Sequence, residues 1–209
     1  TASLYSSSIE NIDLKPEERI DRLRSDRVII QRHRGHKATS DDQLLAWAAL
    51  EVLNNKLMER SPSDSPQTYP PMILDLGAGK GTVTLWLSAL IKTAHFVGIE
   101  AFEQSYDLSL KNRKINHIED RFTPTFGDLR SPQIWNKART EASRLEGSDP
   151  IESADDRGFD LICGAPPFMP LGSGVIPKDP QRASGRFELK GGVEEYLEAV
   201  EGCLAEDGV

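Results

Sequence analysis

The sequence predicts an α/β fold in which a parallel sheet is covered by helices on both faces. Strand-like and helix-like segments alternate from position 72 onward, which is typical of such a sheet. A chain of 209 residues with 38% hydrophobic and 28% charged residues has room for one domain with a proper core, but not for two comfortable domains. The same composition excludes a disordered chain, a fibrous repeat and a disulfide scaffold.

The expected elements follow from periodicity and from turn residues. We predict strands at Val28–Gln31, Met72–Leu76, His95–Glu100, Phe122–Phe126 and Phe159–Cys163, and helices at Asp41–Arg60, Thr82–Ile91, Gln104–Ile115 and from Val193 to Gly208. Ser40 and Gln43 have the spacing of a capping box at the start of the first of these helices. Lys15-Pro16-Glu17-Glu18 predicts a further short helix, because proline and acidic residues favour a first helical turn.

The organisation of the chain follows from these elements. We expect a frayed segment at 1–25, an N-terminal cap of strand and helix at 26–60, a proline-stiffened linker at 61–71, and a core at 72–209 that contains a polar, loop-like insertion at 136–158. The chain begins at Thr1 without an initiator Met and stops at Val209, where a fifth core strand would start. We therefore expect the natural protein to continue beyond Val209, so that the sheet of this chain is truncated at its C-terminal strands.

Charge and cysteine content narrow the function classes. The net charge of −8 argues against a protein that coats nucleic acid by bulk electrostatics. The stretch from Arg22 to Lys37 is nevertheless basic, and it is either a local nucleic-acid face or a solvated surface. Cys163 and Cys203 lack metal-type spacing, and no apolar run is long enough to cross a membrane. We expect free thiols, no metal, a cytoplasmic location and a monomer.

A glycine-rich loop follows the Met72–Leu76 strand and opens a helix. It has the spacing G-x-G-x-G from Gly77 to Gly81, whereas dinucleotide binders have G-x-G-x-x-G. Asp75 would repel a pyrophosphate but could pair with a cationic group, and Glu100 at the end of the next strand could accept both hydroxyls of a ribose. S-adenosylmethionine has a ribose and an ammonium but no phosphate, so it fits this pattern; the alternative is a tight turn without a ligand.

Two further strand ends carry candidate residues. Asp128 follows the Phe122–Phe126 strand and could accept from an adenine amine, or could cap the next turn. Gly164-Ala165-Pro166-Pro167-Phe168 follows the Phe159–Cys163 strand, and its two prolines fix the backbone there. Phe168 would then stack on a planar substrate, or pack as a core side chain of a rigid loop.

Together these segments resemble the class I methyltransferases, which have a doubly wound, Rossmann-like fold, and more closely the branch that contains the bacterial tRNA(Val) adenine N6-methyltransferases. The resemblance runs from about Asp26 to Val209 and includes a tail after the Pro-Pro turn: Gly172-Ser173-Gly174, Pro177, Asp179-Pro180, Arg182, Arg186, Glu188 and Gly191-Gly192. It implies an S-adenosylmethionine-dependent methyltransferase that acts on an adenine amine of tRNA.

The resemblance also implies roles for particular residues. The cofactor would be bound by Asp75, Gly77, Ala78, Gly79, Gly81, Thr82, Glu100, Asp128 and Leu129. The catalytic positions would be Ala165, Pro166, Pro167 and Phe168. The RNA would be contacted by Arg32, Arg34, Lys37, Arg182 and Arg186.

One position departs from the family pattern. Ala165 stands where the family has the Asn of Asn-Pro-Pro-Tyr or Asn-Pro-Pro-Phe, and alanine has no side-chain acceptor for a target amine. An engineered knock-out, a degenerate active site and a lineage with another acceptor would all produce this change. Two alternatives therefore stay open beside tRNA methylation: a methyltransferase of a protein side chain or small molecule, and a cofactor-binding or RNA-binding module without catalysis.

Overall fold

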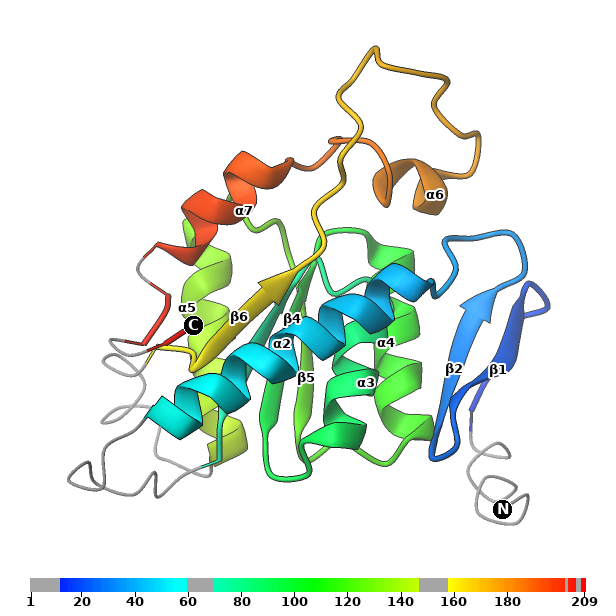
Figure 1. The fold of residues 1–209 in the computed structure, drawn as a ribbon. Helices are drawn as coiled ribbons and strands as arrows, with labels where there is room; N and C mark the ends of the chain where they lie inside the picture. The colour runs from blue at the N-terminus through cyan, green and yellow to red at the C-terminus, as the bar shows by residue number, and fades with distance from the viewer. Residues whose placement is uncertain (1–11, 60–69, 147–157, 202, 206–207) are drawn as a thin grey trace.

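A four-stranded parallel sheet forms the centre of the molecule (Figure 1). The computed structural model describes residues 12–59, 70–146, 158–201, 203–205 and 208–209. The strands are β3 (Met72–Leu76), β4 (His95–Glu100), β5 (Phe122–Phe126) and β6 (Leu161–Gly164), in the spatial order β5-β4-β3-β6. All three pairings are parallel, which confirms the predicted fold class.

The strand order creates a crevice at the carboxyl edge of the sheet. The chain moves outward from β3 to β4 and β5, and it then returns to β6 on the other side of β3. Connections on the two sides of β3 therefore leave in opposite directions, and a crevice opens between them. The ends of β3, β4 and β6 meet at this crevice.

Alternate residues of each strand point to opposite faces of the sheet, and each face has its own core. Ile73 and Phe96 are buried on one face, beneath α2 (Ser40–Glu59), α3 (Thr82–Leu90) and α4 (Glu103–Ile115) (Figure 1). Leu74 and Val97 are buried on the other face, beneath α5 (Pro132–Glu146) and α7 (Val193–Val200). Asp75 lies between Leu74 and Leu76 and shares the α3 face with Ile73.

A separate antiparallel hairpin lies beside α4 (Figure 1). It consists of β1 (Glu18–Arg24) and β2 (Arg27–Arg32), with Ile20 opposite Ile30. The expected helix at Lys15 was therefore wrong, and residues 18–24 are a strand and not part of a frayed segment. Tertiary contacts outweigh the local helix propensity of this segment. β1 pairs with β2, and the Lys111 ammonium of α4 forms an ion pair with the Glu18 carboxylate at 2.7 Å.

The side chains of two asparagines of α4 form hydrogen bonds with the backbone of β2, as a neighbouring strand would. The Asn112 side chain accepts from the Ile30 N–H at 2.6 Å and donates to the Ile30 carbonyl at 3.1 Å. The Asn116 side chain makes the same pair of bonds with Val28, at 3.0 and 2.8 Å. Because residues 28 and 30 face the same way on a strand, asparagines one helical turn apart match their spacing. These four bonds join the hairpin to α4.

The helix boundaries agree with prediction in part. α2 begins at Ser40, as predicted within one residue. Its capping contact lies one residue earlier than the predicted Ser40–Gln43 capping box, because the carboxylate of Asp42 accepts from the Thr39 N–H at 2.7 Å. α7 ends at Val200 instead of continuing to Gly208. A five-residue helix, α6 (Pro180–Ser184), was not predicted. Of the predicted linker at 61–71, residues 61–69 lie outside the described part of the chain.

The polar insertion at 136–158 is largely helical where it is described. α5 covers Pro132–Glu146, so the expected loop does not begin at Asn136; residues 147–157 lie outside the described part. Ile134 and Ala138, one turn apart, are buried against the sheet and explain why the helix forms.

Both cysteines are free, as predicted. Both are also buried, in the cores on opposite faces of the sheet. Across the described residues, no helix has the length and apolar character needed to cross a membrane. Within the same residues, His, Cys, Asp and Glu side chains form no group of three that could hold a metal ion.

Candidate functional site

The glycine loop after β3 lines a pocket at the carboxyl edge of the sheet. Gly77, Gly79 and Gly81 have φ angles of 63°, 59° and 81°, in the left-handed region that residues with a side chain rarely adopt. A Cβ on Gly77 would also lie 2.0 Å from the Tyr196 hydroxyl of α7. Glycine is therefore required here both by the backbone conformation and by the close approach of α7.

Asp75 places a carboxylate at the base of this pocket. Its side chain is 2% exposed and accepts a hydrogen bond from the Thr84 hydroxyl at 2.8 Å. Burial raises the pKa of Asp75 to about 7, although the Thr84 bond opposes the shift. A buried carboxylate poised near neutrality would be stabilised in its charged form by a bound cation.

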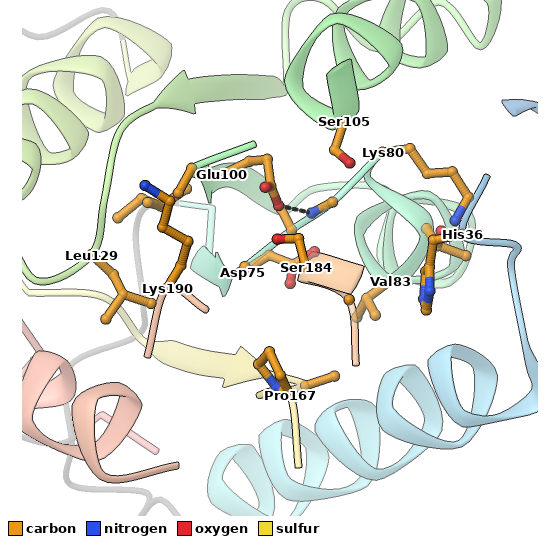
Figure 2. A pocket seen from close by; sticks show the side chains of 18 of the residues that line it. His36, Asp75, Lys80, Val83, Glu100, Ser105, Leu129, Pro167, Ser184 and Lys190 are labelled. Carbon is orange, nitrogen blue, oxygen red and sulfur yellow. Dashed lines mark hydrogen bonds between the residues drawn. The ribbon is translucent and has the colours of Figure 1, made fainter. Parts of the chain in front are cut away.

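Glu100 stands at the end of β4, beside the loop, in the centre of the pocket (Figure 2). One carboxylate oxygen accepts from the Gly79 N–H at 2.8 Å and the other from the Phe102 N–H at 2.6 Å. Burial raises the pKa of Glu100, against the opposing effect of these donors. A carboxylate has about four acceptor positions, so two backbone bonds leave capacity for hydroxyl donors of a ligand.

The end of β5 contributes an apolar wall. Gly127 and Leu129 line the pocket, with Leu129 buried. Asp128 does not lie on the wall: its carboxylate pairs with Arg130, with N–O distances of 2.6 and 2.9 Å. The Arg130 guanidinium holds the pKa of Asp128 below its usual value. Seven of the nine predicted cofactor residues line this pocket: Asp75, Gly77, Ala78, Gly79, Thr82, Glu100 and Leu129. Asp128 and Gly81 do not, and Gly81 is buried.

The Pro-Pro turn after β6 forms the opposite rim. Ala165 and Pro167 line the pocket, and Pro166 is half-buried beside them. Phe168 is 77% exposed and lies outside the pocket wall. The ring is therefore not a core side chain, and its surface is free for contact with a planar group.

The tail after β6 returns over the pocket and is fastened to the loop before α2; we call these contacts the clasp. The Gln181 side chain accepts from the His36 N–H at 3.1 Å and donates to the Ser105 hydroxyl at 3.1 Å. Arg32 of β2 pairs with Asp179 at 2.9 Å, and Asp179 in turn caps α6. The clasp places Gln181, Ser184 and Gly185 on the pocket wall, opposite the glycine loop.

The predicted RNA-contact residues fall into two groups. Arg32 is held by Asp179, and the Lys37 ammonium donates to the Arg32 carbonyl, so both have structural roles. Arg34, Arg182 and Arg186 are exposed on the two segments that meet at the clasp.

Several pocket residues were not predicted from the sequence. Lys80 and His36 line the wall, and Gln181 joins them through the clasp. Lys80 stands inside the glycine motif, where a lysine beside a predicted helix start was a usable signal. The roles of Gln181 and His36 depend on contacts between distant segments, and no local pattern marks them.

The fold and the pocket define a class of protein: an open α/β domain with a small-molecule site at its topological switch point. The site offers an acid for a cation, an acid for hydroxyls and a glycine loop for close backbone approach. This set suits a ligand with a ribose and a cationic group.

Comparisons with known proteins are consistent with this class. No protein-family model matches the chain. The chain is similar to the release factor glutamine methyltransferase of Aliivibrio fischeri, with 27% identity over 53% of this chain and 34% of the relative. It is also similar to the tRNA1(Val) (adenine(37)-N6)-methyltransferase of Flavobacterium johnsoniae, with 27% identity over 67% of this chain and 51% of the relative. The chain thus spans about a third and about half of the lengths of these curated relatives.

Solved structures were also compared. M. jannaschii TYW2 in complex with AdoMet has a TM-score of 0.41 and 14% identity, covering 80% of this chain and 55% of that one. The human methyltransferase 10 domain containing protein has a TM-score of 0.41 and 14% identity, covering 80% of this chain and 63% of that one.

Proposed function

We propose that this protein is an S-adenosylmethionine-dependent methyltransferase. The observation that carries the proposal is the pocket at the switch point, where Asp75, Glu100 and the left-handed glycine loop line one cavity. Both curated relatives are methyltransferases by name, which supports the same activity.

The residues fit the parts of this cofactor. The two oxygens of Glu100, fixed by the N–H groups of Gly79 and Phe102, would accept the ribose hydroxyls. Asp75 would pair with the ammonium of the amino-acid end, and the pairing would offset the cost of burying its charge. Leu129 offers an apolar surface to the adenine. Asp128 would reach the adenine amine only after releasing Arg130.

The reaction requires positioning more than covalent chemistry from the protein. When bound, the cofactor would supply a methyl group on a sulfonium for transfer to the acceptor, and S-adenosylhomocysteine would be left. The glycine loop and Glu100 would fix the cofactor, and the Pro166 carbonyl would accept from the target amine at the rim. Holding both reactants in line lowers the entropic part of the barrier, which in model reactions amounts to about 7–11 kcal/mol.

We further propose that the acceptor is an adenine amine of tRNA. The exposed Phe168 beside the rim would stack a base that has left its helix. Arg34, Arg182 and Arg186 are exposed near the clasp and would contact phosphates. The Flavobacterium johnsoniae relative acts on a tRNA adenine according to its name.

Ala165 favours a second candidate, the methylation of a protein side chain. The residue lines the rim and has no acceptor for an adenine amine, whereas the Aliivibrio fischeri relative acts on a glutamine according to its name. The net charge of −8 also suits a protein acceptor better than a large RNA surface.

Calorimetry with S-adenosylhomocysteine tests the cofactor assignment. We expect micromolar binding, and Glu100→Ala should weaken it by about 1–3 kcal/mol, because the ribose hydroxyls lose their acceptor. Glu103→Ala, an exposed glutamate at the start of α4, is the matched control and should leave the affinity unchanged. Failure of the folded wild-type protein to bind would refute the proposal.

Ala165→Asn tests the acceptor. On an adenine site, the restored carboxamide should raise methylation of tRNA adenine by about 10- to 1000-fold, the usual effect of one well-placed hydrogen bond in a transition state. Methyl incorporation into tRNA and into protein, followed by mass spectrometry of both digests, separates the candidates. Loss of protein methylation in the variant, without a gain on tRNA, would favour the side-chain acceptor.

A further inference from the structure

Lys80 is a buried cation on the wall of the pocket. It is 4% exposed, yet among the described residues no side chain or carbonyl accepts a hydrogen bond from its ammonium. Burial lowers the pKa of Lys80 to about 8, so the group is still largely protonated at neutral pH. Because Lys80 lines the pocket, a ligand bound there could supply the acceptor that the described protein groups do not.

The backbone of Lys80 is held firmly. Its carbonyl accepts from the Asn112 side chain at 2.8 Å, and the glycines on both sides have left-handed φ angles. The direction of the side chain therefore follows from the fold of the loop. Figure 2 shows this side chain running toward His36 on the side of the pocket away from Leu129.

Charges of both signs surround the Lys80 ammonium: the carboxylates of Asp42 and Glu100 raise its pKa, and the ammonium of Lys37 lowers it. Burial lowers the pKa of His36, and the nearby charges of Lys80, Arg186 and Arg182 lower it further. The strongest opposing charge is that of Asp42, whose carboxylate already accepts from the Thr39 N–H and hydroxyl. Lys37 adds a further positive charge, and Glu100 is occupied by backbone donors. Asp42 and Glu100 therefore act on Lys80 through their charge, while their hydrogen bonds go to backbone and hydroxyl donors and not to its ammonium.

We propose that Lys80, with His36 beside it, receives the α-carboxylate of the cofactor's amino-acid end. This inference rests on the proposed function and assigns a group of the cofactor that Asp75 and Glu100 leave unbound. One loop then supplies charges of both signs, with Asp75 for the ammonium and Lys80, five positions later, for the carboxylate.

A zwitterion fits this arrangement better than a phosphate of the acceptor. A backbone phosphate close to Lys80 would bring a negative charge without a compensating cation into a pocket that already contains the carboxylates of Asp75 and Glu100. An amino-acid end carries a compensating ammonium on the carbon that bears its carboxylate. Both charges are therefore neutralised within one small group.

The test compares two ligands that differ only in this carboxylate. S-adenosylhomocysteine and its decarboxylated analogue are titrated into the wild-type protein and into Lys80→Met, a variant of similar shape without the charge. The wild-type protein should prefer S-adenosylhomocysteine by about 10- to 100-fold, the usual effect of one hydrogen bond to a charged group. In Lys80→Met the preference should disappear, with little change in affinity for the analogue. Lys178→Met, an exposed lysine of the tail, should keep the wild-type preference.

Each other outcome overturns the inference in a distinguishable way. Equal affinities of the wild-type protein for the two ligands would overturn the inference without any variant. The inference can therefore be refuted even if Lys80→Met folds poorly. A preference that persists in Lys80→Met, or an equal loss for both ligands, would assign Lys80 a structural role. If Lys80→Met instead weakens adenosine monophosphate relative to adenosine, the anion belongs to the acceptor. If the folded wild-type protein binds neither cofactor ligand, the proposed function fails together with this inference.

Discussion

Asn112→Ala should destabilise the protein strongly, because one side chain joins three parts of the structure. Asn112 is 0% exposed and bonds to the Ile30 N–H, the Ile30 carbonyl and the Lys80 carbonyl. Alanine would leave these three backbone groups without partners in a dry site. Each unpaired buried group costs about 1–3 kcal/mol, and partial entry of water reduces the total, so we expect a loss of about 3–5 kcal/mol.

Urea denaturation followed by circular dichroism measures this loss. Typical domains unfold with about 5–15 kcal/mol, so the variant should still fold but at a much lower urea midpoint, with an unchanged slope. Asn55→Ala, at an exposed position of α2, is the control and should change the stability by no more than about 0.5 kcal/mol. A loss below about 1 kcal/mol in Asn112→Ala would show that the hairpin and the glycine loop do not depend on this side chain.

Two further predictions concern the pocket. Gly77→Ala should lower the stability by about 1–3 kcal/mol and abolish cofactor binding, because the φ of 63° is unfavourable for alanine and the new methyl would clash with Tyr196. Thermal unfolding measures the loss of stability, and calorimetry measures the loss of binding. Wild-type stability and affinity in the variant would contradict this geometry. Cofactor affinity should fall at most about tenfold per pH unit below pH 7, because Asp75, with a pKa of about 7 in the free protein, must lose its proton to pair with an ammonium. Calorimetry from pH 5.5 to 8 should show this fall in the wild-type protein and not in Asp75→Asn, and parallel curves would assign the dependence to another group.

The core of the fold was predictable because local patterns determine it. β4 and β5 have the predicted bounds, since their apolar runs are closed by turns on both sides. β1 was missed because Glu18–Arg24 is rich in charged residues and becomes a strand only by pairing with β2. α6 was missed for a similar reason: five residues form a helix only with the Asp179 cap and the contacts of the clasp.

The candidate site was predictable where backbone geometry dictates the residue type. Glycines at left-handed positions and acids at strand ends leave a signal in the sequence, as Gly77 and Glu100 do. Asn112 and Gln181 act through bonds to segments 82 and 145 positions away, and such spacing has no local signature. The ion pair between Asp128 and Arg130 depends on side-chain conformation and was likewise not predictable.

The clasp would affect the speed of turnover in the proposed enzyme. If the proposed cofactor exchanges by movement of the wall formed by Gln181 and Ser184 away from the glycine loop, that movement breaks two hydrogen bonds and the Arg32–Asp179 pair. Neutral hydrogen bonds of about 0.5–1.5 kcal/mol each, and a part-exposed ion pair of up to about 1 kcal/mol, give an opening free energy of about 1–4 kcal/mol. The open form would then make up about 0.1–15% of the molecules, and product release, not methyl transfer, would limit the catalytic cycle wherever opening is slower than chemistry.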